Sequence, residues 1–146
     1  GALKENYFLD DGAYLAVKMI VALAKASKDG KKLESLIKKL SPLAEEGEYR
    51  FKILADDFKS YGKNVLKIFE ERAREKGYSL PESHEGVRIS FTEGDAQGWI
   101  LLRMSLHDPV MPMNIEGNRK GDLAKLVKIA QDLMKGFEEL ETGCLK

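Results

Sequence analysis

The spacing of hydrophobic residues divides the chain into two parts. In the first part, a nearly continuous apolar run over Gly12–Ala24 follows two aspartates, which predicts a helix with an acidic N-terminus. Because apolar residues cover most of the circumference of this helix, we expect it to be buried on more than one side. A second, shorter helix is predicted over residues 31–40, where leucine and isoleucine recur on one face.

A linker is predicted between the two parts. Ser41-Pro42 ends the second helix, and residues 43–47 form the expected linker. After them the hydrophobic period changes to two, which is typical of a half-buried strand. We therefore place a boundary between a helical segment, residues 1–45, and a second domain, residues 46–146.

The second domain is predicted to contain four strands and two helices in the order βαβββα. Apolar residues on both faces of Trp99–Met104 favour a central strand, whereas Pro112 removes a backbone donor and favours an edge position or a bulge. Four mainly antiparallel strands with two helices on one face form an α+β two-layer sandwich. The predicted elements are strand Tyr49–Ile53, a helix capped by Asp56 or Asp57 and ended by Gly77, strand Val87–Phe91, strand Trp99–Met104, strand Val110–Glu116 and a helix capped by Asp122.

Composition narrows the classes of function. The 146 residues include 24 Lys and Arg against 24 Asp and Glu, so the formal net charge is zero. That balance gives no general attraction for nucleic acid or for an anionic membrane, and we expect neither as a partner. The single cysteine, Cys144, cannot form an internal disulfide, which fits a reducing cytoplasm.

The strongest chemical signal lies in the polar insert between the third and fourth predicted strands, which contains Arg103, Ser105 and His107. A guanidinium group, a hydroxyl group and backbone N–H groups in a short loop are suited to binding a phosphate. An arginine at a strand end is also often merely solvated, and the residues alone leave that alternative open. Trp99 and the methionines at 104, 111 and 113 are expected to fill the core.

The insert resembles the C-terminal phosphate-binding loop of the α-D-phosphohexomutases, the phosphomannomutase/phosphoglucomutase family. In that family the loop usually reads R-x-S-N-T-T-P or R-x-S-G-T-E-P, and residues 103–109 here read R-M-S-L-H-D-P. Three further segments are similar to family motifs: Asp11–Ala16 to D-G-x-Y-x-A, Glu85–Ile89 to D-G-V-R-V and Gly98–Arg103 to G-W-x-L-x-R. The resemblance implies a C-terminal domain often likened to the TATA-binding-protein fold, preceded by the last helix of the third mutase domain.

By this resemblance the loop binds the phosphate of a hexose phosphate. The enzyme then interconverts hexose 1-phosphate and hexose 6-phosphate through a bisphosphorylated sugar. Arg103 supplies the charged grip and Ser105 a hydroxyl donor, while Leu106 and His107 offer backbone N–H groups. Leu106, His107 and Asp108 replace the residues usual in the family. Because a carboxylate repels a phosphate dianion, we expect Asp108 to point away from it.

The chain lacks the other segments on which the family's chemistry depends. It contains no T-A-S-H-N-P-like phosphoserine segment, no D-G-D-x-D metal site and no G-E-M-S-G-H-like sugar loop. We therefore expect this fragment to be inactive alone and to bind no metal itself, with Mg²⁺ held elsewhere in the full-length enzyme. Two isolated histidines, His84 and His107, do not assemble a metal site.

The expected partners are a hexose phosphate (mannose or glucose 1- or 6-phosphate) and the remaining domains of the same enzyme. The first helix, if uncovered, is also expected to cause self-association. The identity of the hexose stays open. Two alternatives belong to other classes: a stand-alone α+β protein-binding module with no phosphosugar role, and a nucleic-acid module, against which the neutral charge argues.

Overall fold

The computed structural model describes residues 4–7, 9–39 and 44–146. The chain divides into two compact units, Gly1–Pro42 and Leu43–Lys146, so the division lies three residues before the boundary that the sequence predicts. Among the described residues, none of the helices combines the length and the apolar character that crossing a membrane requires.

The predicted linker overlaps the first strand of the second unit. Strand β1 (Glu45–Ile53) begins inside it, and Glu45 already pairs with Gly117 of a neighbouring strand. The linker prediction is therefore wrong for residues 45–47, because contacts with distant residues extend the strand beyond its alternating part. Residues 41–43 lie outside the described residues.

The first unit contains one long helix. Helix α1 (Gly12–Lys28) begins after Asp11, whose carboxylate accepts a hydrogen bond of 3.0 Å from the N–H of Tyr14. This confirms the predicted helix and extends it. Two short 3₁₀ helices, η1 (Lys4–Asn6) and η2 (Leu33–Leu36), flank it.

The prediction of a second helix over residues 31–40 is wrong. The structure has the single turn η2 there, and Leu40 lies outside the described residues. Such a short segment gains too few intrahelical hydrogen bonds to offset helix nucleation, and within its unit it packs against α1.

The apolar surface of α1 stays largely open within its unit. Among the described residues of the unit, Ala26 alone is buried, while Val17 and Ile20 are 57% and 66% exposed. Burial on more than one side, as predicted, does not occur within this unit, because η1 and η2 are too short to cover the helix. Met19, Leu23, Leu33, Leu36 and Ile37 instead line an apolar groove of about 890 Å³.

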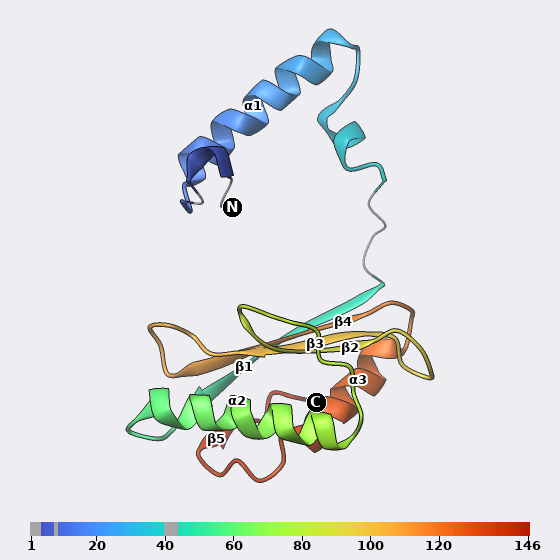
Figure 1. Ribbon diagram of the computed structural model, residues 1–146. Helices are drawn as coiled ribbons and strands as arrows, with labels where there is room; N and C mark the ends of the chain where they lie inside the picture. Colours follow the sequence, from blue (N-terminus) through green and yellow to red (C-terminus); the bar gives the residue numbers. More distant parts are fainter. Residues whose placement is uncertain (1–3, 8, 40–43) are drawn as a thin grey trace. The chain divides into compact units, whose positions relative to one another are not determined.

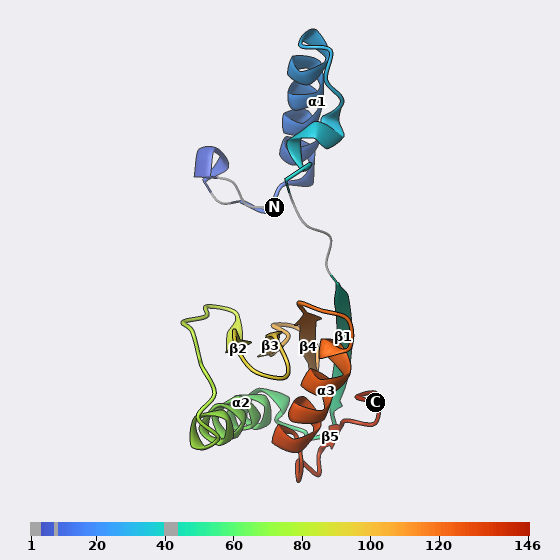
Figure 2. The same ribbon diagram turned by 90° about the vertical axis from the view of Figure 1, so that its right-hand side faces the viewer.

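The second unit is a five-stranded sheet covered on one face by two helices (Figures 1 and 2). The strand order is β2-β3-β4-β1-β5, and all neighbouring strands are antiparallel. The predicted α+β sandwich is confirmed, with one strand added. The remaining elements are α2 (Phe58–Glu75), β2 (Gly86–Phe91), β3 (Gly98–Arg103), β4 (Val110–Gly117), α3 (Asp122–Leu133) and β5 (Leu140–Glu141).

The core lies between the sheet and the two helices. Alternate residues of each long strand point into it, and β3 lies inside the sheet, as its two apolar faces predict. Trp99 is an exception to the predicted core, because it lies half-buried on the face opposite the core residue Ile100. The largest fully buried side chains are Phe51, Phe69, Ile89, Ile100, Leu102, Met111, Met113, Ile115, Leu126, Leu133 and Val65.

Both ends of α2 agree with the sequence signals. The carboxylate of Asp57 accepts a 3.1 Å hydrogen bond from the N–H of Ser60, which caps the N-terminus. Gly77 follows the C-terminus with φ of 73° and donates its N–H to the carbonyl of Arg74 at 2.9 Å. The capped helix therefore begins and ends where the sequence predicts.

The prediction of an edge position or a bulge at Pro112 is wrong. The proline lies in β4, inside the sheet, in regular register with Arg50 of β1. Ile53 donates its N–H to the carbonyl of Pro109 at 2.8 Å. Because backbone directions alternate along a strand, the nitrogen of Pro112 therefore points towards β3. The pairing with β3 ends at Met113, next to Pro112, so the missing donor lies at the end of that ladder rather than inside it.

The prediction that Asp122 caps the last helix is also wrong. Gly121 occupies the cap with φ of 91°, and Asp122 is the first helical residue. The Arg119 guanidinium donates to the Asp122 carboxylate at 3.0 Å and holds the pKa of that carboxyl below its usual 3.8. The exposed N–H groups of the helix are satisfied from β1: the Glu45 carboxylate accepts from Gly121 and Leu123, at 2.9 Å each. These two hydrogen bonds lower the pKa of Glu45.

The two ion pairs of Asp132 are expected to make the stability of the fold depend on pH in the acid range. Its carboxylate pairs with the ammonium groups of Lys76 at 2.7 Å and Lys135 at 2.9 Å, which lower its pKa from 3.8 to about 2. Because this pKa is lower in the folded chain, Asp132 contributes stability above pH 3.8, and the contribution is lost as the pH falls towards about 2. We expect Asp132→Asn to reduce the fall of the melting temperature over that range, measured by thermal unfolding from pH 7 to pH 2.

The exposed Asp56, which has no side-chain partner within the described part of the chain, provides the control. Asp56→Asn is expected to leave the acid-induced fall of the melting temperature unchanged. An identical fall in unaltered and Asp132→Asn chains would show that the two lysine contacts do not persist in solution.

Candidate functional site

The predicted phosphate-binding residues lie at one end of the sheet, where β3 passes into β4 (Figure 1). Arg103 is the last residue of β3, and Ser105, Leu106 and His107 lie in the loop of residues 104–109 that follows. The interior strand β3 thus carries Arg103 directly to the start of this loop. All four predicted residues belong to one short connection.

The backbone of the loop is held at its base. Ser105 donates its N–H to the carbonyl of Val110 at 3.0 Å, which closes the loop across its two ends. Pro109 accepts the N–H of Ile53 at 2.8 Å, so β1 also holds the second end. Within the loop, the Asp108 N–H donates to the Ser105 hydroxyl oxygen at 3.3 Å. The fixed base leaves residues 106–108 as the exposed tip.

Arg103 is half-buried, and its guanidinium makes no hydrogen bond or ion pair within the described part of the chain. Gly86 lies directly opposite it in β2. A Cβ at Gly86 would overlap the Leu102 carbonyl oxygen, so the position requires glycine and places no side chain beside the guanidinium. On the other side, the adjacent position of β4 holds the uncharged Pro112. The neighbouring strand positions therefore offer Arg103 no carboxylate, and its charge is available to a ligand.

The loop offers further donors. The N–H groups of Leu106 and His107 meet no acceptor among the described residues. The Ser105 oxygen accepts from Asp108, which leaves the hydroxyl hydrogen able to donate. Leu106 is 79% exposed, and the side chains of His107 and Asp108 are also exposed. A free guanidinium next to a hydroxyl and two unpaired N–H groups is an arrangement suited to an oxyanion.

One residue of the loop that sequence reasoning assigned to the core has a different role. Met111 and Met113 are buried in the core, as predicted, but Met104 is half-buried and lies against helix α2 at Gly62. The signal in the sequence was a glycine within the apolar face of a helix, where alanine would form a better helix. The contact itself depends on how the loop and the helix pack.

The open face of the sheet, opposite the helices, carries a second polar arrangement. The Trp99 indole N–H donates to the Glu116 carboxylate at 2.9 Å, and the Arg88 guanidinium lies 4.4 Å from the centre of the Trp99 ring. These contacts with Glu116 and Arg88 hold the Trp99 ring on the sheet. Arg88 is therefore engaged, in contrast to Arg103.

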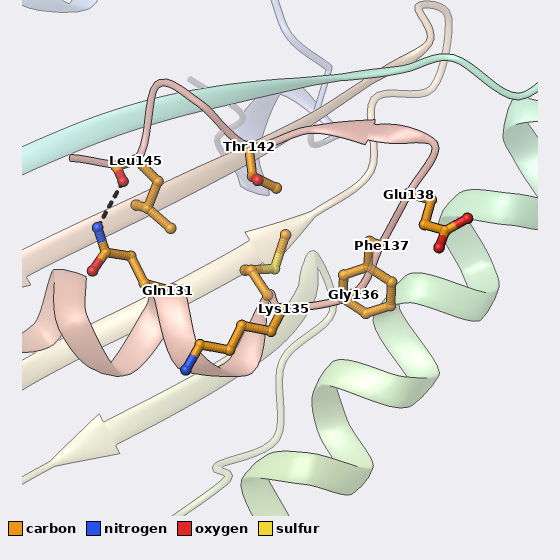
Figure 3. A pocket seen from close by; sticks show the side chains of 8 residues that line it. Gln131, Lys135, Gly136, Phe137, Glu138, Thr142 and Leu145 are labelled. Carbon is orange, nitrogen blue, oxygen red and sulfur yellow. Dashed lines mark hydrogen bonds between the residues drawn. The ribbon is translucent and has the colours of Figure 1, made fainter.

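The described residues contain no group of three or more His, Cys, Asp or Glu side chains that could hold a metal ion. A cavity of about 570 Å³ lies between the end of α3 and the C-terminal segment (Figure 3). Its polar side chains include Gln131, which donates to the Leu145 carbonyl at 2.8 Å, and Lys135, which pairs with Asp132. These contacts hold the C-terminal segment and the turn after α3, and none of the predicted site residues lines the cavity.

No protein-family model matches the chain, but known proteins are similar to it over most of its length. A probable phosphoglucosamine mutase of Methanosphaera stadtmanae is 26% identical over 129 residues, which are 87% of this chain and 26% of the relative. The crystal structure of a phosphoglucomutase/phosphomannomutase family protein from Burkholderia thailandensis has a TM-score of 0.62 and 19% identity, covering 90% of this chain and 25% of that one. The chain thus spans about a quarter of the length of each protein.

Proposed function

We propose that this chain, which is similar in sequence to a probable phosphoglucosamine mutase and in fold to a phosphoglucomutase/phosphomannomutase family protein, is the C-terminal substrate-phosphate-binding part of such an enzyme. The complete enzyme interconverts hexose 1-phosphate and hexose 6-phosphate through a bisphosphorylated sugar. The lone thiol of Cys144 fits a reducing compartment, and we place the enzyme in the cytoplasm.

The observation that supports this proposal is the unpaired guanidinium of Arg103 at the base of a loop with free donors. Arginine matches the geometry of a phosphate with two parallel N–H donors, and its charge persists at all physiological pH values. Ser105 adds its hydroxyl, and the backbones of Leu106 and His107 add two N–H groups. Asp108 repels a dianion, so its carboxylate turns to solvent when phosphate is bound.

In this function the loop binds and orients, and the chemistry occurs elsewhere. Phosphoryl transfer requires a nucleophile and charge stabilisation, which the phosphoserine segment and the Mg²⁺ site of the complete enzyme supply. The loop holds the phosphate that is not being transferred, so the energy of that contact positions the sugar. The fragment alone is inactive, because its sequence contains no phosphoserine segment, no D-G-D-x-D metal site and no sugar loop.

The test is an amide NMR titration of the chain with mannose 1-phosphate at low salt, compared with glucosamine 1-phosphate. Shifts confined to residues 103–109 are the expected result, with weak affinity because the other domains supply most contacts. Equal shifts for both sugars would indicate that the loop reads the phosphate alone. Shifts elsewhere on the chain, or none at high ligand concentration, would contradict the proposed site.

We also propose that the first unit, Gly1–Pro42, is the end of the preceding mutase domain, so that α1 normally packs against residues absent from this chain. The exposed Val17 and Ile20 then leave an apolar surface, and the chain is expected to self-associate as its concentration rises. Ile20→Glu is expected to weaken this association, measured by sedimentation velocity. A monomer at all concentrations would show that the apolar surface of α1 does not drive association.

A further inference from the structure

The side chain of Met104 lies in a space that Gly62 leaves open. A Cβ built on Gly62, in helix α2, would lie 2.5 Å from the Met104 sulfur and 3.2 Å from its Cγ. The same Cβ would meet Ile53 Cδ1 at 3.4 Å. The thioether therefore occupies the position that any larger residue at 62 would fill, and Gly62 is itself buried.

Met104 lies at the first end of the loop, beside the residues proposed to bind phosphate. It is the residue between Arg103 and Ser105, and it is half-buried. The second end of the loop is held by the hydrogen bonds to Pro109 and Val110. At the first end, Met104 contacts α2 one residue before Ser105, whose N–H bonds to Val110, so the packing of Met104 adds a second restraint on the backbone between Arg103 and the free N–H groups.

We propose that Gly62 is a positioning residue for the phosphate loop, acting through Met104. This inference rests on the proposed phosphate site and adds a residue from a different element to it. Gly62 touches no ligand. Because Gly62 has no side chain, Met104 packs against α2. That contact holds Arg103 and the donors of residues 105–107 in one arrangement for the phosphate.

The effect of Gly62→Ala separates positioning from stability. Alanine is a better helix former than glycine, so the substitution favours α2 itself. The added methyl group displaces a flexible thioether rather than the backbone, so the second unit remains folded. Because the displaced thioether belongs to the residue between Arg103 and Ser105, we expect its new position to change the arrangement of the loop.

The experiment is a double-mutant cycle in the whole chain, with mannose 1-phosphate as the probe and amide NMR as the readout. Gly62→Ala is expected to move the amide signals of residues 103–109 before ligand is added and to weaken binding about fivefold or more. Met104→Ala removes the contact of the Met104 side chain with α2 and is expected to weaken binding by a similar factor. In the double variant the new methyl group fills the vacated space, so binding is expected to return to within about twofold of the unaltered chain.

Asn64→Ala, an exposed change in the same helix, is the matched control and is expected to leave both readouts unchanged. Losses that simply multiply in the double variant, or unchanged loop signals and affinity in Gly62→Ala, would overturn the proposal. If Gly62→Ala does not fold, Met104→Phe crowds the same contact from the loop side and is expected to weaken binding likewise. If mannose 1-phosphate moves the amide signals of the unaltered chain but not those of Arg103→Ala, the phosphate site is supported whatever the result for Gly62→Ala. If it moves the amide signals of neither chain, the phosphate site itself is contradicted.

Discussion

Arg103→Ala is expected to reduce kcat/KM of the complete enzyme that we propose by about 10- to 150-fold while the fold is retained. A hydrogen bond to a charged group contributes ~1.5–3 kcal/mol, and each 1.4 kcal/mol corresponds to about a factor of ten. Arg103 makes no hydrogen bond or ion pair through its guanidinium within the described part of the chain, so its removal leaves no buried partner unsatisfied. Steady-state kinetics give kcat/KM, and circular dichroism verifies that the variant is folded.

Arg88 supplies a matched control for the loss of one positive charge from the same face of the sheet. Its guanidinium lies on the Trp99 ring, away from the β3–β4 loop, so Arg88→Ala is expected to change kcat/KM by less than about twofold. A similar loss in both variants would indicate general attraction of the anionic substrate rather than a contact at Arg103. An unchanged kcat/KM in Arg103→Ala would reject the phosphate-binding role.

Much of the fold could be predicted from the sequence because its signals are local. The Asp57 cap, the C-terminal Gly77 and the alternating pattern of β1 each depend on residues close together in the chain. The predictions that failed depend on distant contacts. Glu45 replaces Asp122 as the partner of the helix N-terminus from more than seventy residues away, as the sequence separation of 78 in its bond to Leu123 shows. Strand β5, of two residues, is too short to show a period.

The candidate site divides in the same way. Arg103 and Ser105 were predicted because their motif is contiguous. Gly86 and Gly62 were not, because their importance lies in what they leave open beside Arg103 and Met104 on other elements. A glycine in a strand or helix indicates that some close approach occurs, but the sequence does not say which residue approaches.

Gly98→Ala is expected to lower the free energy of unfolding by roughly 2–4 kcal/mol, the largest stability effect of a single methyl group that we expect in this chain. Gly98 begins β3 with φ of 144°, a backbone conformation that favours glycine. A Cβ there would overlap the Glu116 carbonyl oxygen and lie 2.9 Å from Leu126 Cδ1, so the backbone of β4 would have to move. Urea denaturation followed by circular dichroism measures the loss.

Gly94 in the adjoining turn is the control for this prediction. Its φ of 89° is also positive, but a Cβ on it meets nothing within 4 Å, so Gly94→Ala carries backbone strain without a clash. We expect Gly94→Ala to cost about 1–2 kcal/mol. The excess in Gly98→Ala then measures the close approach of β3 to β4, the pairing that places Arg103 at its end of the sheet. Equal losses in the two variants would mean that backbone strain alone explains the loss in Gly98→Ala, and that β3 and β4 separate easily at the Gly98 end of β3.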